Sequence, residues 1–243
     1  MEKSLIIAHR GASGYAPENT ISAFKMALEM VCDGIELDVH YSKDGHLIVC
    51  HDERVDRTTN GSGFIKDLTL NEIKKLDAGT WFDYKYTNEK IPTLEEVLDI
   101  IWGKDILLNI ELKNGIIQYQ GMEEAVINMV DKYNMYENVI ISSFNHYSLL
   151  KVKEINKKIK TGVLYVAGLI SPWEYAKKIN AQAIHPVFHS VNKEIVKECK
   201  RNNLQVNTYT VNEEQDIHNI GNMKVSGIIT NYPDRAKKII DEI

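Results

Sequence analysis

The amino-acid sequence predicts an α/β protein whose parallel strands close into a (β/α)8 barrel, or TIM barrel. Its 243 residues are the usual size of one such barrel and can bury a large core. Short apolar runs, typical of buried strands, alternate with amphipathic segments along most of the chain. A doubly wound open sheet is the alternative, but it usually carries a glycine-rich phosphate fingerprint that this sequence lacks. We therefore expect a single barrel domain over residues 1–243.

The expected elements are eight strands, each followed in the chain by a helix. The apolar runs predict strands over residues 5–9, 34–40, 106–111, 138–143, 161–166, 182–186, 204–210 and 226–230. The amphipathic segments predict helices at about 19–32, 93–102, 121–135, 146–157, 171–180, 192–202, 213–220 and 233–242. This alternation of strand and helix is the pattern of a parallel barrel.

Residues 41–92, which follow the second strand, interrupt the alternation. The part up to His51 predicts a β-hairpin, because Asp44-Gly45 is a preferred two-residue type I′ loop. With that loop, Asp38 would lie directly opposite His51, close enough for both side chains to share one site. The remainder is long for a connection between a strand and a helix, so we expect it to form a rim or lid over the pocket.

Composition and charge argue against several classes of function. The hydrophobic share of 44% and the charged share of 26% are those of an ordinary globular protein. The formal net charge of −5 argues against a nucleic-acid partner, because no basic excess exists to neutralise a phosphate backbone. No apolar stretch approaches the length of a membrane span, so we expect no stable membrane insertion. The oligomeric state stays open.

The cysteines and the first residues indicate a cytoplasmic protein. The cysteines are few and odd in number, which predicts free thiols in place of a disulfide framework; they are Cys32, Cys50 and Cys199. The chain passes from Met1 almost directly into its first strand, without the apolar segment that a signal peptide requires. We therefore expect a cytoplasmic location.

Seven polar residues lie at or just after the C-terminal ends of expected strands. In a barrel of parallel strands these ends meet on one face, where active sites are built. Three carboxylates suit a hard divalent cation, two imidazoles suit acid–base chemistry, and an arginine with a lysine suits a phosphate. The seven residues are His9, Arg10, Glu36, Asp38, His51, Glu111 and Lys113. Together they indicate hydrolysis of a phosphodiester.

Each of these residues also has a purely structural interpretation. His9 alone could be a solvated strand-end residue, and Arg10 and Lys113 could simply form ion pairs with the carboxylates. Three carboxylates at one barrel mouth would, however, repel one another without a cation. We therefore expect one divalent ion to be bound by Glu36, Asp38 and Glu111. Three further histidines near strands lack matching partners, and we expect them to lie outside the site: His40, His46 and His185.

The order of these motifs resembles one known family. Short motifs follow one another as His9-Arg10-Gly11, Pro17-Glu18-Asn19-Thr20, Glu36-x-Asp38, His51-Asp52, Glu111-x-Lys113, Ser142-Ser143-Phe144, Val206-Asn207-Thr208-Tyr209-Thr210 and Ile228-Ile229-Thr230-Asn231-Tyr232-Pro233-Asp234. Together they resemble the glycerophosphodiester phosphodiesterase family, and the likeness covers nearly the whole chain. The compact segment after the second strand is similar to that of the short bacterial members found in the cytoplasm.

The resemblance implies a metal-dependent hydrolase that cleaves glycerophosphodiesters, a small-molecule substrate class, to sn-glycerol 3-phosphate and an alcohol. It implies one divalent ion, Ca²⁺ or Mg²⁺, at the three carboxylates. It also implies a cyclic phosphate intermediate, with His9 as the base and His51 as the acid. Arg10 and Lys113 would grip the phosphate. The head group stays open between choline, ethanolamine, glycerol and inositol, as does the choice of metal.

Three other residues complete these expectations. Two positions depart from the family pattern, since Tyr209 is often Trp and Asn231 is often Asp in relatives. Neither departure changes the set of seven. Asn19 stands at the start of the first expected helix, where its side chain would cap the free backbone N–H groups.

Two competing functions stay open on the sequence alone. A phospholipase C- or D-like lipase on the same barrel would need an exposed apolar rim, for which Trp81-Phe82 is the candidate. A non-catalytic barrel that binds phosphodiesters would be expected to lack one of the imidazoles or carboxylates. All seven residues are present here, which favours the hydrolase.

Overall fold

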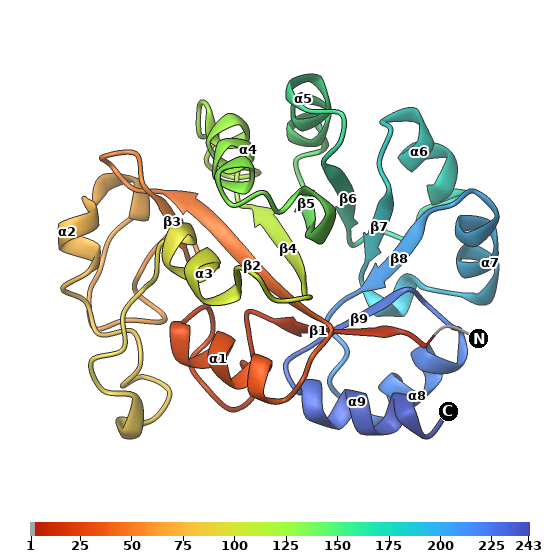
Figure 1. The fold of residues 1–243 in the computed structure, drawn as a ribbon, viewed down its shortest axis with the longest axis horizontal. Coiled ribbons are helices and arrows are strands. Elements are labelled where there is room, and N and C mark those ends of the chain that lie inside the picture. Colours follow the sequence, from red (N-terminus) through yellow and green to blue (C-terminus); the bar gives the residue numbers. More distant parts are fainter. Residues whose placement is uncertain (1–2) are drawn as a thin grey trace.

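The computed structural model describes residues 3–243, and within them a single sheet closes into a barrel (Figure 1). The strands are β1 (Leu5–His9), β2 (Gly34–Tyr41), β3 (Leu47–Val49), β4 (Leu107–Leu112), β5 (Val139–Ser143), β6 (Lys160–Tyr165), β7 (Ala183–Pro186), β8 (Gln205–Thr208) and β9 (Gly227–Thr230). Every neighbouring pair in the barrel is parallel, and the pairing of β1 with both β9 and β2 closes the ring. The predicted eight-stranded parallel barrel is confirmed, with β3 as one additional strand.

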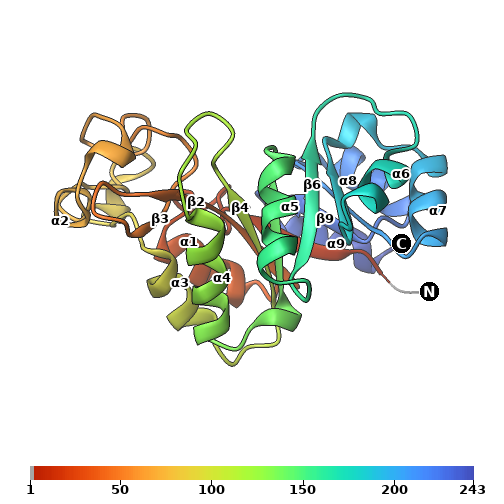
Figure 2. The ribbon, with the colours of Figure 1, turned by 90° about the horizontal axis from the view of Figure 1, so that it is seen from above.

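Helices surround the barrel, as Figures 1 and 2 show. They are α1 (Ile21–Glu29), α2 (Leu70–Ile73), α3 (Leu94–Ile101), α4 (Met122–Lys132), α5 (His146–Ile155), α6 (Pro172–Lys178), α7 (Lys193–Arg201), α8 (Glu214–Asn222) and α9 (Pro233–Asp241). Short 3₁₀ turns span Ile65–Asp67, Tyr84–Tyr86, Tyr136–Asn138 and Phe188–Ser190. All eight predicted helices are present, with α2 as a further short one inside the insertion. No helix in residues 3–243 combines the length and apolarity that a membrane span requires.

The helix α3 illustrates how the local sequence sets an element. Thr93 accepts a hydrogen bond from the N–H of Glu96, and the Glu96 carboxylate accepts one from the N–H of Thr93. This capping box starts the helix because it satisfies backbone donors that have no partner inside the helix. The apolar residues then recur three and four positions apart, and all are buried against the barrel: Leu94, Val97, Leu98 and Ile101.

The register of the hairpin between β2 and β3 differs from the predicted one. Val39 pairs with Val49, and the N–H of Cys50 donates to the carbonyl of Asp38 across 3.1 Å. Asp38 therefore lies opposite Cys50, and the prediction that it lies opposite His51 was wrong. The loop has three residues and ends on Gly45 at φ +82°, a left-handed conformation that glycine adopts without strain. A two-residue type I′ loop would have shifted the register by one residue.

The rest of the insertion folds against the hairpin as a small lobe, seen beyond β3 in Figures 1 and 2. It has its own apolar cluster, which includes Val55, Ile65 and Ile73. Hydrogen bonds tie it to the start of the barrel: Tyr86 donates to the carbonyl of Tyr15, and Ser22 donates to the carboxylate of Glu89. The lobe thus forms a wall beside the loop between β1 and α1.

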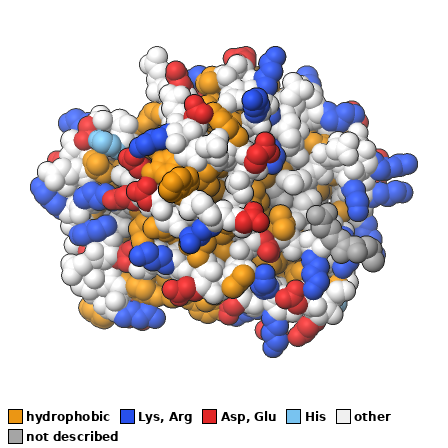
Figure 3. Space-filling model, in the orientation of Figure 1, with side chains coloured by type: hydrophobic (Ala, Val, Ile, Leu, Met, Phe, Trp, Pro, Cys, Tyr) orange, Lys and Arg blue, Asp and Glu red, His pale blue; other side chains and the backbone are white. Residues whose placement is uncertain are grey.

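The loops that follow β4 and β6 project from the same side of the barrel in Figure 2. This side holds the carboxyl ends of the strands, because all barrel strands are parallel. On the face seen in Figure 3, basic and acidic side chains are interspersed, so neither sign dominates it.

Candidate active site

Three carboxylates meet at the carboxyl end of the barrel. Asp38 on β2 pairs in register with Glu111 on β4, and Glu36 precedes Asp38 by two residues on the same face of β2. One oxygen from each carboxylate lies within 4.8 Å of the others. The exposed fractions are only 4% for Glu36, 1% for Asp38 and 8% for Glu111. The structure therefore brings together the three residues that the sequence proposed as metal ligands.

The electrostatics of this cluster favour a cation. Burial raises the pKa of Glu36 well above its usual range, and the charges of Asp38 and Glu111 add to the effect. Burial, with Asp38 next, also raises the pKa of Glu111 to about 7. The Oδ1 atom of Asp38 is buried and has no hydrogen-bond partner in the described residues. A buried carboxylate oxygen without a hydrogen bond, beside two others, is the donor set that Ca²⁺ or Mg²⁺ prefers.

Two cationic side chains border the carboxylates. The Nε atom of Arg10 lies 3.4 Å from Asp38, and the Nζ atom of Lys113 lies 3.0 Å from Glu111 and 3.7 Å from Asp38. Although burial opposes ionisation, these two cations hold the pKa of Asp38 below its usual range. The backbone N–H of Arg10 also donates to the carboxylate of Glu36 across 2.9 Å. Both cations therefore lie where they could contact a phosphate next to the cluster.

His9 ends β1 next to this cluster, and its imidazole has a defined partner. Its Nδ1 atom lies 2.7 Å from Oδ1 of Asn231, an amide oxygen that can only accept, so Nδ1 carries the hydrogen. Burial, followed by the charge of Arg10, lowers the pKa of His9 to about 4. The ring is therefore neutral near pH 7 and leaves the lone pair of Nε2 available as a base.

His51 lies just beyond β3 and is held by a chain of charged side chains. Its Nδ1 atom is 2.7 Å from Asp52, and Asp52 accepts two hydrogen bonds from Arg57, at 2.7 and 3.0 Å. Arg57 also donates to Glu18, at 2.9 and 2.8 Å, and Glu18 accepts from Arg10 at 2.9 Å. The Arg57 hydrogen bonds lower the pKa of Asp52 to about 2. The chain thus links His51 to Arg10 across the site.

Two residues of the site have roles that the sequence did not indicate. Arg57 bridges Glu18 and Asp52, but a single arginine in an irregular segment carries no signal that separates it from a surface residue. Asn19 was expected to cap α1, and that prediction was wrong. Thr20 is the cap, with its hydroxyl accepting from the N–H of Ala23. Asn19 instead donates to Asp38 across 2.9 Å from a buried position.

The other histidines near strands behave differently from one another. His46 is half-exposed beside Asp44 in the hairpin loop, and His185 is buried inside the barrel, where Asn207 is its hydrogen-bond partner. His40, by contrast, lies on the same face of β2 as the carboxylates and contacts the main chain of His51. The alternation of residues along β2 was the signal that could have found it.

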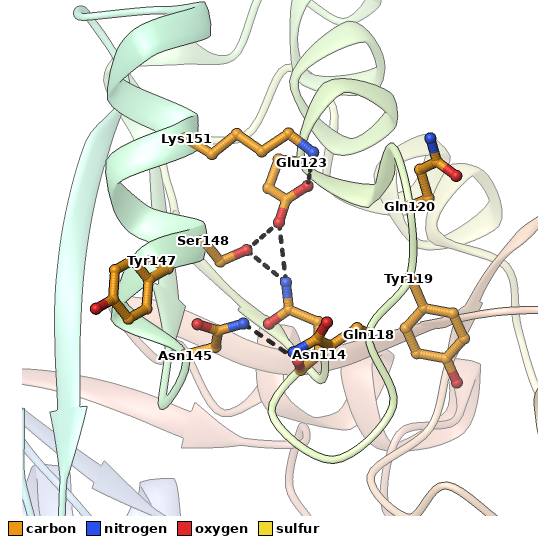
Figure 4. Close-up of a pocket in the computed structure, with 9 residues that line it drawn as sticks. All are labelled: Asn114, Gln118, Tyr119, Gln120, Glu123, Asn145, Tyr147, Ser148 and Lys151. Atoms are coloured by element: carbon orange, nitrogen blue, oxygen red, sulfur yellow. Dashed lines mark hydrogen bonds and ion pairs between the residues drawn. The ribbon is translucent and has the colours of Figure 1, made fainter.

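A separate pocket of about 430 Å³ opens between the loop after β4 and the start of α5 (Figure 4). Its floor is a set of buried polar groups, in which Asn114 and Ser148 both donate to the carboxylate of Glu123. Lys151 pairs with the other oxygen of that carboxylate at 2.8 Å. These groups satisfy one another, and none of them belongs to the carboxylate cluster.

Comparisons with known proteins agree with this geometry. Residues 9–235 match the sequence pattern of the glycerophosphoryl diester phosphodiesterase family. A glycerophosphodiester phosphodiesterase of Caldanaerobacter subterraneus is 52% identical over 238 residues, which cover 98% of both chains. The solved structure of an Oleispira antarctica phosphodiesterase, in complex with the product sn-glycerol-3-phosphate, has a TM-score of 0.90 and 30% identity. That match covers 98% of this chain and 97% of the other.

A second solved structure gives the same result. A putative glycerophosphoryl diester phosphodiesterase from Silicibacter pomeroyi has a TM-score of 0.90 at 26% identity, with 100% of this chain and 95% of the other covered. The matched range, residues 9–235, spans the positions of all seven candidate residues. The chain belongs to the glycerophosphoryl diester phosphodiesterase family.

Proposed function

We propose that this protein is a metal-dependent enzyme that hydrolyses glycerophosphodiesters to sn-glycerol 3-phosphate and an alcohol. The observation that carries the proposal is the convergence of three buried carboxylates, two imidazoles and two cations at the carboxyl end of the barrel. Family membership supports it, as does the related Oleispira enzyme with its bound product. The substrate is a small molecule.

We assign the metal to Glu36, Asp38 and Glu111. Carboxylate oxygens are the ligands that Ca²⁺ and Mg²⁺ prefer, and the buried Oδ1 of Asp38, which accepts no hydrogen bond, fits such an ion. When bound, either ion would supply positive charge that offsets the charge of a phosphate oxygen during nucleophilic attack. Arg10 and Lys113 would hold the phosphate and stabilise the charge that develops on it.

The two histidines divide the proton transfers in this proposal. Nε2 of His9 takes the proton of the glycerol 2-hydroxyl, whose oxygen then attacks phosphorus to form a cyclic phosphate. His51 gives a proton to the departing alkoxide. In the second step His51 takes a proton from water, which opens the cyclic phosphate, and His9 returns its proton to the 2-oxygen. The low pKa of His9 supports its role as the base, because the ring is unprotonated at neutral pH.

Two further observations support the predicted cellular location and domain organisation. All three cysteines are buried and unpaired, as expected for a protein of a reducing compartment, and this supports a cytoplasmic location. The closed barrel of residues 3–243, with the lobe packed against its hairpin, supports one domain over the chain.

An assay of product release tests the proposal. Glycerophosphodiesters with choline, ethanolamine, glycerol and inositol head groups are incubated with the enzyme, and glycerol 3-phosphate is measured by a coupled reaction. We expect release that chelator abolishes and that added Mg²⁺ or Ca²⁺ restores. Release of phosphocholine from the choline ester would indicate cleavage of the other ester bond, as in a C-type lipase. Tight substrate binding without any release would indicate a non-catalytic barrel.

A further inference from the structure

His40 shares a face of β2 with two of the proposed metal ligands, yet it has no place in the reaction described above. Glu36, Asp38 and His40 are spaced two residues apart on one strand, so their side chains point to the same side. His40 is fully buried. A buried imidazole beside an active site requires hydrogen-bond partners, because a buried polar group without a hydrogen bond is destabilising.

Both ring nitrogens of His40 have such partners. Nε2 lies 3.1 Å from the carbonyl oxygen of His51, which can only accept, so Nε2 carries the hydrogen. Nδ1 therefore has a lone pair and accepts from the hydroxyl of Tyr119 across 3.0 Å. With both nitrogens in use, His40 cannot transfer a proton to substrate. It can only hold other groups in place.

The main chain of His51, which His40 contacts, has few other restraints. The strand β3 ends at Val49, and the last bond of the hairpin ladder is the one from the N–H of Cys50. His51 follows this point, so strand pairing does not fix its main chain. Its side chain is bound to Asp52, which is itself 30% exposed. The hydrogen bond from His40 is a buried restraint on the backbone of His51.

Tyr119 joins this restraint to the loop after β4, which begins at Lys113. Its ring packs edge-on against His40, with centroids 5.7 Å apart, and against Tyr41 at 5.9 Å. Two pockets of about 430 and 460 Å³ flank the loop, and Gln118, Tyr119 and Gln120 line both of them. Figure 4 shows Tyr119 at the edge of the first pocket. Tyr119 thus forms a wall between two open spaces and ties the loop to β2.

We propose that His40 is a positioning residue that, through Tyr119 and the carbonyl of His51, links the loop carrying Lys113 to the imidazole that protonates the leaving group. The proposal rests on the role given to His51 above.

Two substitutions at His40 separate this role from a merely structural one. In His40→Gln the amide N–H can reach the position of Nε2 and still donate to the carbonyl of His51. In His40→Asn the shorter side chain places its amide near the position of Nδ1 and cannot reach that carbonyl. The two variants carry the same functional group and differ by one methylene, so a difference between them reports the reach of the donor.

The readout is the dependence on leaving group. If His51 is displaced, protonation of an alkoxide suffers, whereas a p-nitrophenolate leaves without that proton. We expect His40→Asn to lower kcat/KM for glycerophosphocholine by about 10²-fold, the size of effect that a displacement of 1 Å can have, and to leave the p-nitrophenyl ester nearly unchanged. His40→Gln should recover most of the loss. Tyr119→Phe should show a smaller loss in the same direction.

The control is Tyr41→Phe. Tyr41 packs on the ring of Tyr119 and donates to the carbonyl of Gly121, at the end of the loop after β4. It makes no hydrogen bond to His40. We expect this variant to keep wild-type activity on both substrates. Thermal unfolding of each variant shows whether a loss of activity accompanies a loss of fold.

The outcomes distinguish the inference from the proposed function. If His51→Ala does not lose activity selectively on the alkyl substrate, the acid role of His51 fails. Suppose instead that His51→Ala shows that selectivity. If His40→Asn then lowers kcat/KM equally for both substrates, or for neither, only the inference is overturned. If His40→Asn does not fold, Tyr119→Phe decides, and equal behaviour of Tyr119→Phe and Tyr41→Phe would overturn the link to the loop.

Discussion

The imidazole of His9 donates from Nδ1 to the amide oxygen of Asn231 across 2.7 Å, which joins the end of β1 to the residue that follows β9. Asn231 is held in turn, because its N–H donates to Asn212 across 2.9 Å. An amide orients the ring without adding negative charge. Within residues 3–243, no charged hydrogen-bond partner opposes burial and the charge of Arg10, which together lower the pKa of His9 to about 4.

A carboxylate at position 231 should change the pH profile. In Asn231→Asp the new charge stabilises the protonated ring and raises the pKa of His9. Because the proposed base must be unprotonated, the acidic limb of the profile of kcat/KM should move to higher pH. Asn212→Asp is the matched control. It adds the same charge behind Asn231, without a direct bond to the His9 ring, and position 212 keeps the oxygen that accepts from the N–H of Asn231. It should move the limb less. An acidic limb at the same pH in Asn231→Asp and wild type would contradict the role of His9.

Metal binding should stabilise the fold. A ligand that binds only the native state adds about 2.7 kcal/mol at a concentration of 100 times its Kd, so Mg²⁺ or Ca²⁺ should raise the unfolding temperature. Asp38→Asn removes one of the three carboxylates and should abolish most of that increase. Asp52→Asn removes a carboxylate from the same mouth but outside the cluster, and it should retain the increase. Differential scanning fluorimetry with and without metal measures this. Equal increases in both variants would place the ion elsewhere.

His9 and His51, the proposed base and acid, should differ in how strongly they depend on the leaving group. His51→Ala should strongly slow substrates with an alkoxide leaving group and slow p-nitrophenyl esters far less, because p-nitrophenolate needs little proton assistance. His9→Ala removes the base that activates the nucleophile, so both substrates should lose activity, by about 10²–10⁴-fold. Steady-state kinetics on both substrates tests this. Equal losses in the two variants on both substrates would show that the roles are not separate.

The hairpin loop should require glycine at position 45 because of its backbone conformation, and not because a side chain would lack room. A side chain at Gly45 would meet no atom within 4 Å, but the residue has φ +82°. Gly45→Ala should therefore lower the free energy of unfolding by about 1–2 kcal/mol, and Gly45→Asn by less, because asparagine tolerates the left-handed region. Gly115→Ala, at an equally open position without a positive φ, is the control and should have little effect. Urea unfolding measures the difference. Similar losses at Gly45 and Gly115 would show that the loop conformation is not what matters.

The sequence by itself determined the order of the strands and helices and the seven residues at the barrel mouth. Both depend on local patterns, since apolar periodicity indicates each element and parallel strands bring their carboxyl ends to one face. The pairing of Asp38 with Glu111 follows from that arrangement. For the same reason, the predicted eight-stranded barrel is confirmed even though several element boundaries differ by a few residues.

Only the tertiary structure decided the contacts that orient these residues. Asn231 is 222 residues from His9, Tyr119 is 79 residues from His40, and Arg57 is 39 residues from Glu18. No spacing or periodicity relates such pairs, because the backbone brings them together only when the barrel closes. The positive φ of Gly45 did not by itself fix the hairpin register. A glycine permits both the two-residue and the three-residue loop, so packing of the strands decides between them.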